Sequence, residues 1–122
     1  MSDPSELIAR LLKRQLFVAW STPRVPAAEL RPSLAAHLEY WIAQEKAGVL
    51  FAAGPFTHGP RAVEGEGMMI VRARDREHAK EIFDRDPFHE TGLRSYELYD
   101  WLLNEGRIGI QLDFSDQSCE LL

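Results

Sequence analysis

Apolar residues recur along the chain in two spacings, one typical of strands and one typical of helices. Four compact runs rich in β-branched, aromatic and other apolar residues predict strands. Between them, apolar residues three and four positions apart predict helices. The predicted strands cover 16–21, 49–53, 68–74 and 95–102, and the predicted helices cover 4–14, 27–47 and 76–85, the last capped by Asp75.

The helix predicted over 27–47 has an apolar stripe that should face the rest of the protein. It also contains Pro32, which lacks a backbone N–H and clashes with the preceding turn of a helix. The regular helix is therefore expected to begin only near Arg31 and to end at Gly48. The stripe consists of Leu30, Leu34, Leu38 and Trp41 or Ile42.

The order of elements in the middle of the chain is strand, helix, strand, strand, helix, strand. This order predicts an α+β fold of the ferredoxin-like βαββαβ type with an antiparallel sheet. We expect a single domain over 1–122, with an N-terminal helix extension at 1–15, a core at 16–105 and an acidic tail at 106–122. A long loop over 57–67, rich in glycine, joins two of the strands.

Two helices can cover only one face of a four-stranded sheet, yet the strands are apolar on both faces. In the first strand, Leu16, Val18 and Trp20 alternate with Phe17 and Ala19. Soluble monomers rarely leave so large an apolar surface in water. We therefore expect a homodimer packed sheet face to sheet face, although the N-terminal helix or the C-terminal tail could cover the surface instead.

Composition narrows the class of protein further. The chain has 122 residues, is 45% hydrophobic and 27% charged, and carries a net charge of −5, which suits a globular domain and disfavours nucleic acid as a partner. No apolar run is long enough for a membrane span. The single cysteine, Cys119, suits a reducing compartment, so a cytoplasmic location is expected.

None of the four histidines belongs to a recognised metal-binding motif, and no phosphate-binding or dinucleotide-binding motif is present. His37 lies at helical spacing from Leu34 and Trp41, at the edge of the stripe. One interpretation is a structural histidine at the edge of the core. The other is a general acid/base, because histidine titrates near neutrality and needs only a carboxylate to orient its ring.

Asp86 is a candidate for that carboxylate, although an Asp-Pro step also commonly ends a helix. Gly54-Pro55 ends a predicted strand, and there a ligand can approach the backbone closely. Taken together, His37, Gly54-Pro55, Asp86-Pro87-Phe88 and Gly92 resemble the motif set of the YciI-like family. The spacing of 17 residues from His37 to Gly54 and of 6 from Asp86 to Gly92 matches the family's pattern.

The resemblance implies a dimeric α/β-barrel built from ferredoxin-like subunits, with a His–Asp dyad beside a pocket between helix and sheet. His37 would then transfer the proton and Asp86 would orient it. Some relatives eliminate halide from chlorinated aromatic compounds without a cofactor, so no cofactor and no metal are expected. The N-terminal helix and the acidic tail are departures from the family, and Arg31-Pro32 lies three residues earlier than in a typical member.

Our leading hypothesis is a cofactor-free enzyme that isomerises or eliminates next to a carbonyl or phenol of a small substrate. His37 and Asp86 are its predicted catalytic residues. Substrate contacts are predicted from Gly54, Pro55, His58 and Arg61, the last two in the glycine-rich loop. The alternatives are a non-catalytic dimeric module that binds a ligand or a protein, and a haem-degrading or quinone-forming monooxygenase on the same type of barrel.

Overall fold

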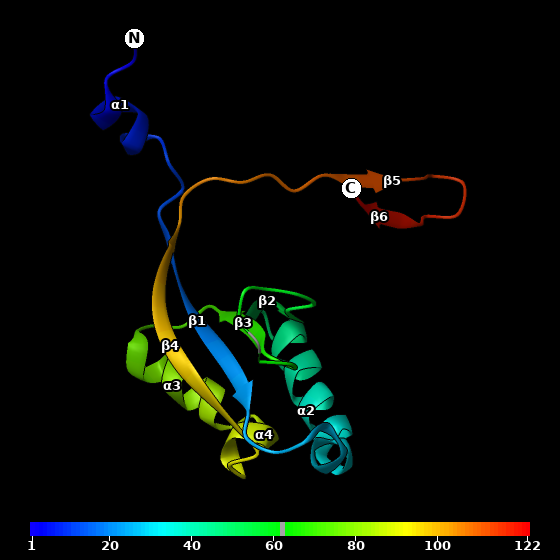
Figure 1. Ribbon diagram of the computed structural model, residues 1–122. Coiled ribbons are helices and arrows are strands. Elements are labelled where there is room, and N and C mark those ends of the chain that lie inside the picture. Colours follow the sequence, from blue (N-terminus) through cyan, green and yellow to red (C-terminus); the bar gives the residue numbers. More distant parts are fainter. Residues whose placement is uncertain (62) are drawn as a thin grey trace. The chain divides into compact units, whose positions relative to one another are not determined.

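A computed structural model describes residues 1–61 and 63–122 (Figure 1). Ala62, part of the loop predicted over 57–67, lies outside the described residues. Among the described residues, no helix has the length and apolar character needed to cross a membrane. The elements are α1 (Pro4–Ala9), β1 (Arg14–Pro23), α2 (Ala27–Lys46), β2 (Leu50–Pro55), β3 (Gly67–Val71), α3 (Arg76–Asp84), α4 (Pro87–Glu90), β4 (Arg94–Leu103), β5 (Ile110–Leu112) and β6 (Cys119–Leu121).

Four strands form one sheet in the order β2-β3-β1-β4, which places the first and third strands at its centre. β3 pairs antiparallel with both β1 and β2, with Val18 opposite Ile70 and Gly54 opposite Met68. Figure 1 shows the long strands β1 and β4 side by side. The predicted ferredoxin-like α+β fold is therefore confirmed.

The core lies between one face of this sheet and the two helices α2 and α3. Side chains alternate between the faces of a strand, so Phe17 and Ala19 point to the helices while Leu16 and Val18 point away. The buried cluster on the helix side consists of Phe17, Ala19, Met69 and Val71 from the sheet, Trp41 from α2, and Ala79, Ile82 and Phe83 from α3.

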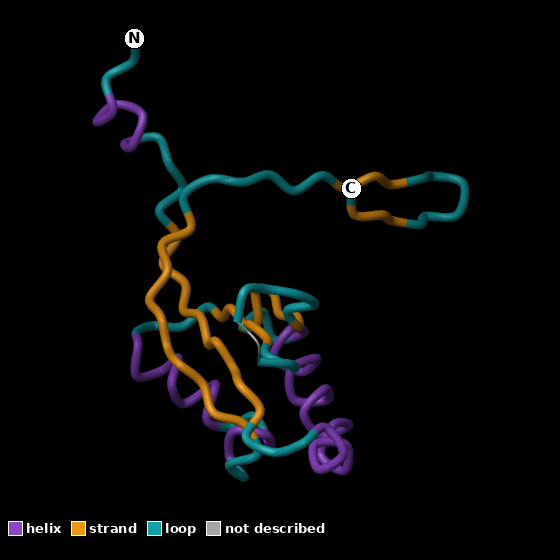
Figure 2. The backbone as a smooth tube through the Cα atoms, in the orientation of Figure 1, coloured by secondary structure: helices purple, strands orange, loops and turns teal. Residues whose placement is uncertain are grey.

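The helix α2 differs from its prediction in two respects. It begins at Ala27, not near Arg31, because the chain accommodates Pro32 inside the helix. Figure 2 shows α2 as one continuous helical segment. The apolar stripe is not wholly inward either. Trp41 is buried, but Leu34 and Leu38 are 44% and 49% exposed because they line an open cavity described below.

The remaining elements follow the predicted order with shifted ends. The N-terminal helix stops at Ala9 instead of 14. Asp3 and the predicted cap Asp75 each accept a backbone N–H of their helix. After α3 the chain forms the short helix α4, which the prediction lacked. The tail contains a hairpin, β5 paired with β6, that the sequence pattern did not locate.

The described chain divides into two compact units. The larger, Gln15–Leu102, contains the body of the sheet and the helices α2, α3 and α4. The smaller combines Met1–Arg14 with Leu103–Leu122 and contains α1 and the tail hairpin. The expectation of a single domain over 1–122 with two added ends stays a prediction.

Candidate active site

Asp86 occupies the junction between α3 and α4. It is the N-cap of α4, with Pro87 in the first turn, and its carboxylate accepts the backbone N–H of Phe88 at 2.9 Å. The side chain is fully buried. The Asp-Pro step thus ends one helix and begins another, and it holds a carboxylate inside the protein.

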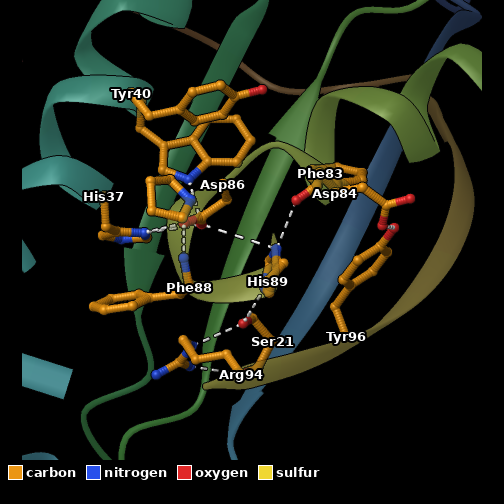
Figure 3. Close-up of polar contacts among 12 residues, drawn as sticks. Ser21, His37, Tyr40, Phe83, Asp84, Asp86, Phe88, His89, Arg94 and Tyr96 are labelled. Carbon is orange, nitrogen blue, oxygen red and sulfur yellow. Dashed lines mark hydrogen bonds and ion pairs between the residues drawn. The ribbon is translucent and has the colours of Figure 1, made fainter. Parts of the chain in front are cut away.

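Two residues of α2 donate to this carboxylate (Figure 3). His37 approaches with Nδ1 at 2.8 Å, and Trp41 donates its indole N–H at 2.7 Å. The two residues lie four positions apart, so they share one face of the helix. The predicted His37–Asp86 pair is therefore in direct contact in the structure, and Trp41, which the sequence indicated only as an apolar core residue, is a further partner.

The hydrogen bonds keep Asp86 ionised. Burial raises the pKa of a carboxyl group, but the donors His37, Trp41 and the Phe88 N–H outweigh burial and hold the pKa of Asp86 below 3.8. A carboxylate only accepts hydrogen bonds, so neutral His37 must carry its proton on Nδ1. Its Nε2 then has a free lone pair that can take a proton from a bound molecule.

The His37 ring is fixed from a second side by Phe88. The two rings stack with centroids 4.4 Å apart at 25°. The His37 side chain retains 19% exposure, whereas Asp86 has none. The imidazole is therefore oriented by buried groups and still accessible.

That exposure opens into a cavity of about 620 Å³ between α2 and the sheet. Gly54 and Pro55 of β2 line it with His37. Gly67 of β3 also lines it, and a Cβ there would lie 3.2 Å from the Gly54 carbonyl oxygen, so a larger residue would push the two strands apart by a few tenths of an ångström. The other lining residues include Ser21, Arg31, Leu34, Leu38, Met69, Phe88 and Arg94.

His58 and Arg61 lie elsewhere. They line a second cavity of about 700 Å³ that also contains Trp20 and Glu66. Arg61 is 3.5 Å from the Glu66 carboxylate and lies over the Trp20 ring, 5.4 Å from its centroid. The structure therefore brings together His37, Asp86, Gly54 and Pro55 but places the two loop residues in different surroundings.

A second polar network borders the first cavity, and sequence reasoning missed it. The His89 ring bonds the Phe83 carbonyl through Nδ1 and the Ser21 hydroxyl through Nε2, each at 2.8 Å. Arg94 donates Nε–H to the same hydroxyl at 2.8 Å (Figure 3). The only signal was the position of His89 one helical turn after Asp86, because Ser21 and Arg94 lie on different strands.

Burial also sets the charge of His89. Its side chain is 2% exposed, and this burial lowers its pKa below 6.5 against the opposing effects of the Phe83 carbonyl and Asp86. Among the residues that the structure describes, no group of three or more His, Cys, Asp or Glu side chains is arranged to hold a metal ion.

The comparisons with known proteins cover most of the chain. A family model described as the YCII-related domain matches residues 16–102. No curated protein gives a significant match.

Among solved structures, the chain is similar to 5-chloro-2-hydroxyhydroquinone dehydrochlorinase from Burkholderia phenoliruptrix AC1100 in complex with 2,5-dihydroxybenzoquinone. The TM-score is 0.57 and the identity 21%, over 70% of this chain and 92% of that one. At this identity the likeness supports the fold. Because the family model spans well over half of the sequence, this chain belongs to the YCII-related family.

Proposed function

We propose that this protein is an enzyme acting on a small molecule bound in the cavity between α2 and the sheet, with His37 as its general acid/base. The observation that carries the proposal is the fixed imidazole. Nδ1 is bound to a buried carboxylate at 2.8 Å, while the ring borders the cavity. Membership of the YCII-related family and the fold shared with a dehydrochlorinase support it.

The chemistry follows from the tautomer. His37 Nε2 removes a proton next to a carbonyl or from a phenol, and the electron pair of that bond moves into the substrate. In an isomerisation the imidazolium returns the proton at another atom, and in an elimination a halide leaves with its electron pair. A positioned base of this kind contributes roughly 100- to 10,000-fold in rate.

Asp86 holds the ring in the useful tautomer and stabilises the imidazolium that forms. Gly54 and Pro55 border the substrate. Substrate contacts from His58 and Arg61 stay predictions of the sequence, since these residues line the second cavity. A homodimer through the open sheet face and a cytoplasmic location are likewise predictions.

The experiment is a turnover assay with matched histidine variants. The first compound to test is 5-chloro-2-hydroxyhydroquinone, with release of chloride as the readout. A second readout is solvent deuterium exchange into small ketones and phenols. For whichever compound reacts, His37→Gln should lower kcat by about 100-fold or more. His78→Gln, at a residue of α3 outside this cavity, should leave kcat within about twofold.

A folded His37→Gln protein with full turnover would refute the proposal. Compounds that bind at the cavity without turnover, in wild type and variant alike, would favour a non-catalytic binding module.

A further inference from the structure

The charged side chains around the cavity are all of one sign. Arg31 and Arg94 line it, and among the described lining residues there is no Asp or Glu. The chain as a whole carries a net charge of −5, so the positive charge around the cavity is opposite in sign to the charge of the whole protein. Two buried carboxylates lie near Arg94, and both already accept hydrogen bonds. Asp86 accepts from His37, Trp41 and Phe88, and Glu66 accepts from Trp20 and Thr22.

Arg94 is the best-fixed cation of this set. Its Nη2 donates to the Ser21 carbonyl at 2.9 Å and to the Gly65 carbonyl at 2.7 Å, and its Nε donates to the Ser21 hydroxyl. Ser21 and Gly65 both line the cavity, so the guanidinium lies at the cavity wall. None of these bonds uses Nη1, and within the described part of the chain no acceptor is bound to it.

The network behind Arg94 gives the guanidinium a fixed position. The Phe83 carbonyl can only accept, so the neutral His89 ring donates Nδ1–H to it and presents Nε2 as an acceptor. The Ser21 proton goes to His89 Nε2, which leaves the Ser21 oxygen free to accept from Arg94. Ser21 and His89 are 1% and 2% exposed, so the hydrogen bond between them is shielded from water.

We propose that the cavity takes a small, flat organic anion, with an oxygen of the ligand bound to Nη1 of Arg94. Carboxylates, phenolates and enolates share the required chemistry, a planar oxygen anion on an apolar body that fits the Leu34, Leu38 and Phe88 side chains. The inference rests on the proposed function, since it names the class of substrate for the same cavity. In Figure 3 the Phe88 ring lies between His37 and Arg94, which places the base and the cation at one wall.

The test compares benzoate with its uncharged analogue benzamide by calorimetry and by NMR of the arginine side-chain N–H signals. Wild type should bind benzoate at least about 10-fold more tightly than benzamide. Arg94→Gln should weaken benzoate by about 10- to 100-fold and change benzamide by less than about twofold. Arg94→Lys, which keeps the charge but loses the planar fork, should retain part of the preference.

Arg72→Gln is the matched control, because Arg72 directly follows β3, lies outside the cavity lining and contacts the Gly48 carbonyl and the Phe51 ring. It should bind benzoate as wild type does. If Arg94→Gln does not fold, the inference is still tested by the ratio of benzoate to benzamide affinity in wild type and in Arg94→Lys.

Equal or undetectable binding of the two probes to wild type overturns the inference, and so does unchanged benzoate affinity in Arg94→Gln. His37→Gln separates the two proposals. Undiminished turnover in that variant overturns the role of His37, while its benzoate affinity reports on Arg94 alone.

Discussion

At the scale of single residues, Asp86 is a buried, ionised carboxylate on which the stability of the fold depends. Its carboxylate is fully buried and accepts from His37, Trp41 and the Phe88 N–H. Desolvation of a charge is expensive, and only these donors compensate for it. Loss of the carboxylate therefore leaves several buried donors without a partner.

Asp86→Asn should lower the free energy of unfolding by about 3 kcal/mol at pH 7, measured by urea denaturation. The folded-state pKa of Asp86 lies below its ordinary 3.8, so its stabilisation is complete above that pH and is lost as pH falls through the folded pKa. The difference between wild type and variant should accordingly shrink below about pH 4.

Asp100→Asn is the control for that measurement. Asp100 forms an ion pair with Arg76, but both side chains are more than half exposed, so the change should be at most about 1 kcal/mol. Equal losses in the two variants, or a difference that does not vary with pH, would contradict this account of Asp86.

At the scale of elements, α2 positions both the base and the cavity. The buried Trp41 packs in the core, while the N-terminal part of the helix stands over the cavity with Leu34 and Leu38 partly exposed. The helix runs through Pro32, which lacks the N–H for one backbone hydrogen bond and crowds the preceding turn. Pro32 therefore makes the helix locally less stable where it borders the cavity.

Pro32→Ala should raise the free energy of unfolding by about 1–3 kcal/mol, because alanine restores the missing N–H and removes the steric clash. Thermal or urea unfolding measures the gain. Pro26→Ala is the matched control, since Pro26 is the N-cap, where no N–H is needed by the helix, and it should change stability little. No gain at Pro32, or an equal gain at both positions, would show that Pro32 does not destabilise the helix.

At the scale of the whole molecule, the helices α2 and α3 pack on the same face of the sheet. Tyr96 and Leu98 of β4 pack on the helix side, so alternation directs Tyr99 and Trp101 to the other face, where they are 48% and 38% exposed. Aromatic side chains exposed on an apolar face are typical of protein interfaces. Leu16, Val18 and Ile70 on this face are already buried within one chain, so the homodimer stays a prediction that rests on Tyr99 and Trp101.

Light scattering should give twice the chain mass of 13.9 kDa. Tyr99→Glu should shift the protein toward the monomer, because a carboxylate would be buried without a partner in the interface. Ile42→Glu, at a residue of α2 that is 55% exposed, should leave the dimer intact. A wild-type monomer, or dissociation by both variants, would contradict the sheet-face interface.

Local chemistry was enough to predict much of this protein. Asp75 was predicted to cap a helix because a short acidic side chain before a helix accepts hydrogen bonds from its free N–H groups, and it is the N-cap of α3. The order of strands and helices followed from apolar spacing, and it led to the ferredoxin-like sheet. The pairing of His37 with Asp86 was predicted from helical spacing and a family resemblance, and the two residues lie in contact.

Only the tertiary structure showed which residues far apart in the sequence form hydrogen bonds with one another. Trp41 as a partner of Asp86, and Ser21 with His89 and Arg94, join residues 45, 68 and 73 positions apart. The course of α2 through Pro32 was also outside local rules, because contacts along the rest of a 20-residue helix outweigh one lost hydrogen bond. Which donors reach a buried acceptor depends on how the helices pack on the sheet. The periodicity of apolar residues along the chain does not determine the distance between a donor and that acceptor.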